Sequence, residues 1–316
     1  MKKILSIVLS LSMILALAAC GGSSEGFSVD KVNITYVTSP LNVPSIIEKN
    51  EASLQAVYKE MGLDFGYSEL TSGADQTAAL ASGDIQILNA VGGSSVLLAA
   101  ANDADIKIIS MYSRAPKAFA MFSNDTSLTS PESLKGKSIA GPKGTNLHEL
   151  LVAYLATAGM SVEDVNYVSM DIPSALAAME SGSVDVALLG GAAAYNAQQA
   201  GKHMICDGEG LIAATICTAT SQVFYDRNPQ IIEAFMKEQQ RIVDYMLANE
   251  EAVMQITADS LDMDIEAVKT MYPMYDFSVT ISAEDLELLQ ATEEFLFNSG
   301  MIENHVDVNE LVLEVK

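Results

Sequence analysis

The chain has 316 residues, with 17 basic and 41 acidic side chains and a formal net charge of −24 at pH 7. A surface this acidic repels nucleic acid and anionic lipid headgroups, so we expect no nucleic-acid partner. Three cysteines and three histidines show no Cys-x-x-Cys or Cys/His spacing, and the sequence therefore predicts no metal site and no cofactor.

Residues 1–19 have the features of a lipoprotein signal peptide. Two lysines precede the apolar run ILSIVLSLSMILALAA, which ends at Cys20 and is followed by the polar GGSSEG. The tetrad LAAC resembles a bacterial lipobox, which implies cleavage before Cys20 and lipid attachment to it. We expect residues 20–30 to be a lipid anchor and flexible tether outside the cytoplasmic membrane. A plain signal peptide with a chance cysteine is the alternative.

Strands and helices are expected to alternate after residue 30. The expected strands of the first half are 32–37, 64–70, 85–91, 106–113 and 115–124, and the expected helices are 45–61, 74–81 and 94–103. This alternation predicts a mainly parallel sheet with helices on both faces.

A polar break at 125–137 precedes a second run of the same pattern. Its expected strands are 138–142, 165–170, 184–189 and 203–207, and its expected helices are 146–159, 173–181 and 192–201. A β-rich stretch at 213–226 follows, and the remainder is predicted to be helical. Asn228-Pro229 starts one of these helices, with an apolar stripe behind it, and Ser282 opens another with a capping box. The sequence thus predicts two α/β lobes.

One corner occurs in both lobes. SGDIQILNAVGG (82–93) and SGSVDVALLGG (181–191) each contain a Ser-Gly turn, a short apolar strand and a Gly-Gly pair. Ligands of such sheets bind at the carboxyl ends of the strands, where both Gly-Gly pairs are expected. Glycine there lets another backbone approach closely. We expect the two corners to face one another across a cleft, with simple tight turns as the alternative.

The stretch GPKGTNLHE (141–149) holds the main candidate site. Gly144, Thr145 and Asn146 are expected at the start of a helix, where free amides and the helix dipole suit an anionic or polar group. The GK[ST] ending of a phosphate-binding loop is absent. Capping of the helix by Thr145 is the alternative role for that side chain. His148, in the first turn, is a weaker candidate, because a lone histidine is more often packed or solvated.

Contributions from the facing side of the cleft are expected at other strand ends and helix starts. The candidates in the first lobe are Ser39, Asn42, Gly93, Ser94 and Ser95, and two further candidates in the second lobe are Gly191 and Tyr195. Arg114 and Lys143 are possible counter-charges, although each is more readily explained as a surface charge.

Four stretches carry a resemblance to a known family: ALASGDIQI, SLKGKSIAGPKGTNLHELLVAYLATAG, ALAAMESGSVDVALL and DRNPQIIEAFMKE. Through them the chain resembles the extracytoplasmic solute-binding proteins of ABC importers for nitrate, taurine and aliphatic sulfonates. Thiamine-precursor binders belong to the same NMT1/THI5-like superfamily. The resemblance implies a type II periplasmic-binding-protein fold, in which two α/β lobes are joined by two crossing strands, APKAFAMF and TICTATSQVF. It implies lobe 1 at 31–118 and 220–316, and lobe 2 at 119–219.

The implied function is the lipid-anchored substrate-binding component of an ABC importer, a monomer that captures a small polar or anionic solute and delivers it to a permease and its ATPase. Binding of a thiamine-precursor pyrimidine or another heterocycle, and ligand sensing for a membrane kinase, are alternatives. A related pyrimidine-synthase enzyme would need a cysteine-rich iron-binding motif and a reactive histidine. The chain has too few cysteines and histidines for this, so we do not expect the protein to be an enzyme.

Two departures from the family leave the ligand open. Sulfonate binders often carry Trp after the second corner and Asp inside the first, whereas this chain has no Trp and has Gln86 in the place of that Asp. Whether Cys206 and Cys217 form a disulfide also stays open.

Overall fold

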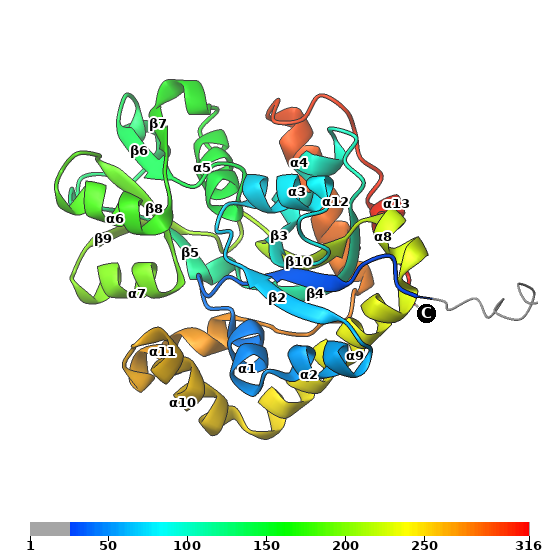
Figure 1. Ribbon diagram of the computed structural model, residues 1–316. Helices are drawn as coiled ribbons and strands as arrows, with labels where there is room; N and C mark the ends of the chain where they lie inside the picture. Colours follow the sequence, from blue (N-terminus) through cyan, green and yellow to red (C-terminus); the bar gives the residue numbers. More distant parts are fainter. Residues whose placement is uncertain (1–25, 316) are drawn as a thin grey trace, which may run out of the picture.

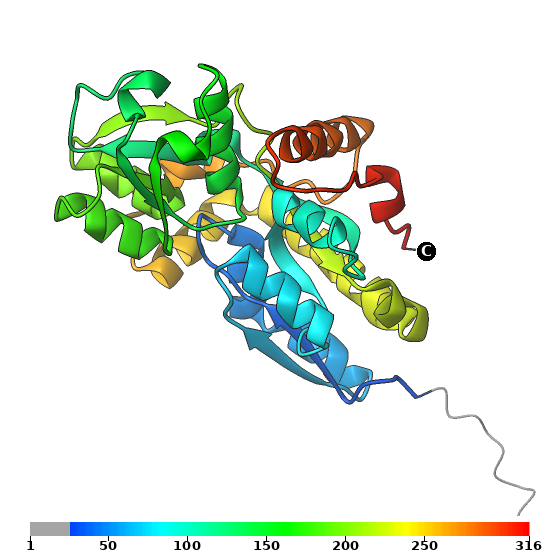
Figure 2. The same cartoon turned by 90° about the horizontal axis from the view of Figure 1, so that it is seen from above.

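This computed structural model describes residues 26–315, which are organised around three β-sheets, two in the first lobe and one in the second (Figure 1). The predicted signal peptide at 1–19, Cys20 and the first part of the predicted tether lie outside the described residues. Seen from above, the lobe drawn in green lies beside the lobe drawn in blue and cyan (Figure 2). This is the two-lobe α/β architecture that the sequence predicts.

In the first lobe, the two-stranded sheet β1-β2 adjoins the three-stranded sheet β3-β10-β4. The strands of this lobe are β1 (Lys31–Thr35), β2 (Asp64–Ser68), β3 (Leu88–Gly92), β4 (Lys107–Arg114) and β10 (Thr215–Thr220). β1 and β2 pair in parallel, and a parallel bridge between Ile34 and Ile87 joins β1 to the residues before β3. β10 runs antiparallel between β3 and β4. The strands of the first lobe are therefore parallel except for β10, the strand that returns from the second lobe.

The sheet of the second lobe has the order β7-β6-β8-β5-β9. Its strands are β5 (Phe119–Ser123), β6 (Ser138–Gly141), β7 (Asn166–Ser169), β8 (Val186–Gly190) and β9 (His203–Asp207). β6 is parallel to β7 and β8, whereas β5 is antiparallel to both of its neighbours, β8 and β9. Each lobe thus has one antiparallel strand, and in each it is the strand reached directly after a crossing.

Helices cover both sheets. The first lobe contributes α1 (Val43–Glu51), α2 (Ser53–Glu60), α3 (Gly73–Ser82) and α4 (Gly93–Ala100), and the second contributes α5 (Asn146–Ala156), α6 (Ile172–Glu180) and α7 (Gly191–Gln199). The C-terminal part forms α8 (Gln222–Arg227), α9 (Pro229–Ala248), α10 (Glu250–Leu261), α11 (Ile265–Met271), α12 (Ala283–Asn298) and α13 (Val308–Leu311). The apolar stripe predicted for α9 is buried, namely Ile231, Ile232, Phe235, Ile242, Val243 and Met246.

The expected helix 45–61 is two helices, α1 and α2. Ala52 between them adopts left-handed backbone angles, with φ of 52°. The buried carboxylate of Glu48 accepts a hydrogen bond from the Leu54 amide at 3.0 Å, and it also accepts one from the Tyr67 hydroxyl at 2.6 Å. Glu48 therefore caps the start of α2, a tertiary arrangement that helical periodicity does not reveal.

The chain crosses between the lobes twice, from β4 to β5 and from β9 to β10. The predicted end of the second lobe, at 219/220, falls inside β10. All of β10, however, pairs with β3 and β4 of the first lobe. We therefore propose that the second lobe ends in the connection 208–214. Cys206 in β9 and Cys217 in β10 are free thiols in different sheets, and burial raises the pKa of each to about 12.

Helices α10 and α11 pass beneath both lobes in Figure 1. α10 packs against α1 of the first lobe, whereas α11 packs against α7 of the second. The C-terminal region, expected to belong to the first lobe alone, thus also contacts the second. Within residues 26–315, no helix combines the length and apolar character needed to cross a membrane.

A buried ion pair joins β4 to α12. Arg114 Nε donates to Asp285 Oδ1 and Nη2 donates to Oδ2, both at 2.6 Å, and Asp285 is only 2% exposed. Although burial disfavours the Asp285 carboxylate, the bonds from Arg114 and Ser282 keep its pKa below the usual value. Arg114 is thus committed to this pair and is not a counter-charge for a ligand.

We expect Arg114→Met to lower the free energy of unfolding by about 3 kcal/mol, because it leaves the Asp285 carboxylate buried without its cation. Urea denaturation measures the change. Lys117→Met is the matched control, since the Lys117–Glu209 pair is solvent-exposed and its loss should change stability little. Equal stability of wild type and Arg114→Met would contradict this account of the pair.

Candidate functional site

A cleft between the lobes brings together the carboxyl ends of β1, β3 and β6. The space in it that protein atoms do not fill is about 560 Å³, part of it open to solvent. Its lining comes from both lobes and comprises Val37, Ser39, Pro40, Asn42, Thr71, Gly73, Gln76, Ala90, Gly92, Ser95, Phe119, Pro142, Thr145, Asn146, Leu147, Ile172 and Ile216. Five predicted residues are therefore brought together here, namely Ser39, Asn42, Ser95, Thr145 and Asn146.

The two Gly-Gly corners each press against the opposite lobe. A Cβ on Gly92 would lie 3.3 Å from Asn146 Oδ1, at the start of α5. Gly191, with φ of +55°, sits so close to Pro40 that a Cβ would overlap the Pro40 carbonyl. The predicted close backbone approach is thus confirmed at the second corner. The expectation that the corners face one another is wrong, because one faces α5 and the other faces the turn before α1.

Three hydrogen bonds cross the cleft beside the first corner. Ser94 Oγ donates to Asn146 Oδ1 at 3.1 Å, and Ser95 Oγ donates to the Gly144 carbonyl at 2.5 Å. Asn146 Nδ2 donates to the Thr215 carbonyl of β10 at 3.3 Å. Because these bonds join the starts of α4 and α5, they hold the lobes in a closed arrangement. They also use side-chain hydrogen-bond donors, those of Ser94 and Asn146, that we expected to bind a ligand.

Helices α4 and α5 start at this cleft without side-chain caps. Gly92 before α4 has no side chain to offer, and the Thr145 hydroxyl donates to the Pro142 carbonyl at 2.9 Å instead of capping α5. The alternative that Thr145 simply caps the helix is therefore wrong. By contrast, α3 and α6, whose first residues also line the cleft, are capped: Ser72 accepts from the Asp75 amide at 3.1 Å, and Asp171 accepts from the Ser174 amide at 2.7 Å. Uncapped first-turn amides remain available to an anionic group.

None of the described residues that line the cleft carries a charge. Lys143 is exposed and is not among the lining residues. The charge of an anionic ligand would thus be met by backbone amides and helix dipoles, not by an ion pair.

His148 does not line the cleft. Its ring is buried and stacks on Tyr167, with centroids 4.8 Å apart, and Nδ1 accepts from the Gly144 amide at 3.4 Å. Burial, with a smaller contribution from Lys143, lowers the pKa of the imidazole to about 4. His148 is therefore a neutral packing residue that supports the loop before α5.

Five other predicted residues do not line the cleft. Gly93 packs against Thr215 and Leu289, while Ser94 and Gly144 take part in the hydrogen bonds that cross the cleft. Gly191 and Tyr195 instead line a separate cavity with Met271 of α11 and Met274. That these residues contact the ligand directly stays a prediction, and their absence from the cleft lining does not support it.

Sequence reasoning missed several residues of the lining. Gln76 on α3 is 3% exposed, and Thr71 adds a hydroxyl. Phe119 and Ile172 supply apolar surface. Gln76 lies in the helix just before the quoted corner motif, so proximity to that motif was the available signal. Phe119 and Ile172 gave none, because apolar side chains in strands and helices normally indicate core.

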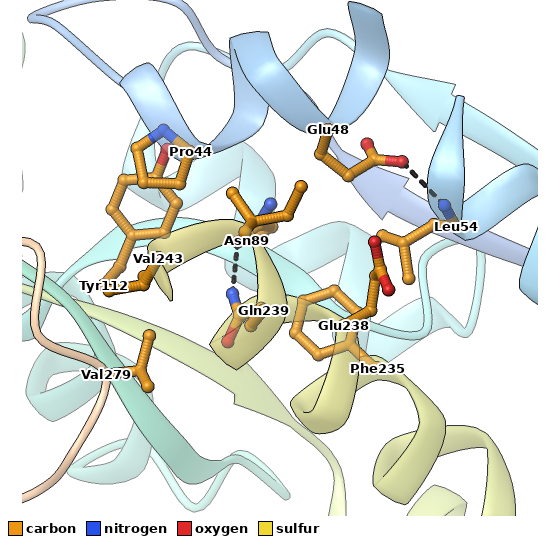
Figure 3. Close-up of a pocket in the computed structure, with 11 residues that line it drawn as sticks. Pro44, Glu48, Leu54, Asn89, Tyr112, Phe235, Glu238, Gln239, Val243 and Val279 are labelled. Atoms are coloured by element: carbon orange, nitrogen blue, oxygen red, sulfur yellow. Dashed lines mark hydrogen bonds between the residues drawn. The ribbon is translucent and has the colours of Figure 1, made fainter. Parts of the chain in front are cut away.

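A second cavity lies within the first lobe (Figure 3). It lies between α1, α9 and the sheet strands β3 and β4, and its space not filled by protein atoms is about 350 Å³, part of it open to solvent. Glu48, Asn89, Tyr112 and Gln239 lie in its wall. Its polar groups pair with one another: Gln239 Nε2 donates to Asn89 Oδ1 at 3.0 Å, and Glu48 accepts from Leu54. Burial raises the pKa of Glu48. Because this cavity has no wall from the second lobe, closure of the lobes cannot capture a ligand there.

Glu149 on α5 forms a buried contact with the first lobe. It is 4% exposed, and its Oε1 accepts from the Thr292 hydroxyl of α12 at 3.2 Å. Burial raises the pKa of this carboxyl to about 7, although hydrogen bonds from Thr292 and Ser94 partly oppose the shift. Protonation of the Glu149 carboxyl is therefore favoured when the two lobes are in contact.

Comparisons with known proteins agree with this architecture. A family model described as NMT1/THI5 like matches residues 52–253. The taurine-binding periplasmic protein of Escherichia coli K12 is 29% identical over 215 residues, which span 67% of this chain and 65% of that protein. A putative aliphatic sulfonates-binding protein of Bacillus subtilis 168 is 24% identical across 99% of this chain and 95% of that protein.

Solved structures show the same fold. The alkanesulfonate-binding protein SsuA of Xanthomonas axonopodis pv. citri, bound to MOPS, superposes with a TM-score of 0.81 at 21% identity and covers 90% of this chain and 99% of that one. The desulfurization enzyme DSZB shares the architecture more distantly, with a TM-score of 0.64 at 13% identity over 90% of this chain and 97% of its own. The family model covers more than half of the sequence, and the two-lobe fold agrees with it. The chain therefore belongs to the NMT1/THI5-like family.

Proposed function

We propose that this protein is the lipid-anchored substrate-binding component of an ABC importer and that it captures a small sulfonate of the taurine or alkanesulfonate type between its lobes. One observation carries the proposal. The uncapped starts of α4 and α5, from opposite lobes, meet at a cleft whose described lining has no charged side chain.

This site suits a sulfonate for a physical reason. A sulfonate stays ionised at any physiological pH and presents several acceptor oxygens, so first-turn amides and helix dipoles can satisfy it without a counter-ion. The relatives that bear taurine- and sulfonate-binding names support this ligand class. The absence of charged lining residues also leaves room for other polar solutes, including a pyrimidine that packs on Phe119.

Isothermal titration calorimetry with taurine, longer alkanesulfonates, nitrate and an aminopyrimidine tests the ligand class. We expect a sulfonate to bind most tightly. Tightest binding of the aminopyrimidine would favour the heterocycle alternative, and no binding of any sulfonate would overturn the proposal.

The anchor and the partners belong to the same proposal. The lipobox at Cys20 places the protein on the outer face of the cell membrane, where a monomer would deliver ligand to a permease and its ATPase. We expect Cys20→Ser to release the protein from membranes or leave it unprocessed, as fractionation and mass spectrometry would show. Membrane-bound mature protein without lipid on residue 20 would contradict the anchor.

A further inference from the structure

Two buried amide oxygens in the cleft have no hydrogen-bond partner among the described residues. The first is Asn42 Oδ1, on a side chain that is 2% exposed. The Asn42 Nδ2 group donates to the Val37 carbonyl at 2.8 Å and to the Ser39 carbonyl at 3.3 Å. A carbonyl oxygen can only accept a hydrogen bond, so the atom that faces these carbonyls must be the amide nitrogen. This fixes the orientation of the amide and leaves its oxygen without a partner.

The second is Gln76 Oε1, on a side chain that is 3% exposed. Gln76 Nε2 donates to the Leu70 carbonyl at 2.9 Å, so the orientation of this amide is fixed in the same way. Both side chains line the cleft between the lobes. The other buried unpartnered atoms in the described chain are hydroxyls of Ser53, Ser113 and Tyr275, and none of them lines this cleft.

Unpaired buried acceptors are costly, and native proteins rarely keep them. A sulfonate head cannot satisfy them, since its oxygens are also acceptors. The cleft therefore presents two complementary features, namely amide donors at the start of α5 and amide acceptors on Asn42 and Gln76. A ligand that matches both carries an anionic group and a hydrogen-bond donor on the same small molecule.

We propose that Asn42 and Gln76 are specificity-determining residues that select sulfonates bearing an N–H or O–H donor. The inference rests on the proposed function and narrows its ligand class from alkanesulfonates in general to amino- and hydroxyalkanesulfonates. Gln76 and Asn42 hold the donor, while the first turn of α5 holds the sulfonate.

Three two-carbon sulfonates separate these contributions: taurine, 2-hydroxyethanesulfonate and ethanesulfonate, which end in an ammonium, a hydroxyl and a methyl group. We expect calorimetry to show that taurine or 2-hydroxyethanesulfonate binds about 5- to 150-fold more tightly than ethanesulfonate, because the methyl group leaves both amide oxygens unpaired. Preference for one of the two identifies the donor as ammonium or hydroxyl.

Gln76→Leu then tests the assignment to a residue. We expect this variant to bind the donor-bearing ligands at least fivefold more weakly while its affinity for ethanesulfonate is unchanged or improved. Gln86→Leu is the matched control, because Gln86 is also a buried glutamine but bonds to Asn33 and Gly83 outside the cleft. The ratio of affinities should be that of the wild type in this control.

The outcomes distinguish the two proposals. Equal wild-type affinity for all three sulfonates would overturn donor selection and leave sulfonate binding intact. If Gln76→Leu has the wild-type ratio of affinities for donor-bearing sulfonates and ethanesulfonate, the assignment of donor selection to Gln76 is overturned. Binding of none of the three would overturn the proposed function, and donor selection would fall with it.

Discussion

Gly191→Ala should abolish tight ligand binding while both lobes stay folded. The new Cβ would overlap the Pro40 carbonyl, which belongs to the backbone of the opposite lobe and cannot rotate away. The lobes must then separate at this corner, and only the closed cleft presents both of its walls to a ligand. If relief of the overlap costs about 3 kcal/mol, calorimetry with the cognate sulfonate should show an affinity loss of about 100-fold or more.

Gly182→Ala separates this effect from backbone strain. Gly182 also has a positive φ, +75°, but a Cβ there would meet nothing within 4 Å. Both variants should lose a similar, small amount of stability in urea, since alanine is disfavoured in the left-handed region. Wild-type affinity in Gly191→Ala, or an equal affinity loss in the two variants, would show that this corner does not control closure.

Ligand affinity should fall as the pH rises from about 4.5 to 7, by about 10- to 100-fold in total. The closed form holds Glu149 with its pKa raised to about 7, whereas separation of α5 from Thr292 should return the carboxyl toward its ordinary value of 4.5. Between these values the closed form binds a proton that the open form lacks. Each increment of pH therefore favours the open form, and the dependence should flatten above pH 7 and below pH 4.5.

Glu149→Gln should remove most of this pH dependence, because the amide keeps a polar group beside Thr292 and does not titrate. His148 does not obscure the result, since its pKa of about 4 lies below the range. Calorimetry from pH 4.5 to 8 with a sulfonate, whose own charge is constant, supplies the measurement. Persistence of the full wild-type slope in Glu149→Gln would assign the pH dependence to another group.

Local sequence signals predicted the architecture well. The repeated strand–helix pattern predicted two α/β lobes. Both Gly-Gly pairs correctly marked strand ends, and at the second pair another backbone approaches closely. The start of α5 was also predicted, because a small polar loop before an apolar helix is a local feature. These features share one property: each depends on residues adjacent in sequence.

Features that depend on distant contacts were predicted poorly. The β-richness of 215–220 indicated a strand, but only its pairing with β3 and β4 assigns it to the first lobe. His148 looked available in the sequence, and it is the stacking on Tyr167 that removes it from the cleft. Gln76 was overlooked because its unpaired oxygen becomes apparent only when the Leu70 carbonyl is seen to fix its amide.

The start of α5 is the centre of the account, and a crystal structure of the protein with taurine tests it most directly. We predict a closed cleft in which sulfonate oxygens lie about 2.7–3.2 Å from first-turn backbone nitrogens of α5, with the bond between Ser94 and Asn146 retained. A sulfonate bound by lysine or arginine side chains elsewhere, or in the cavity within the first lobe, would contradict it.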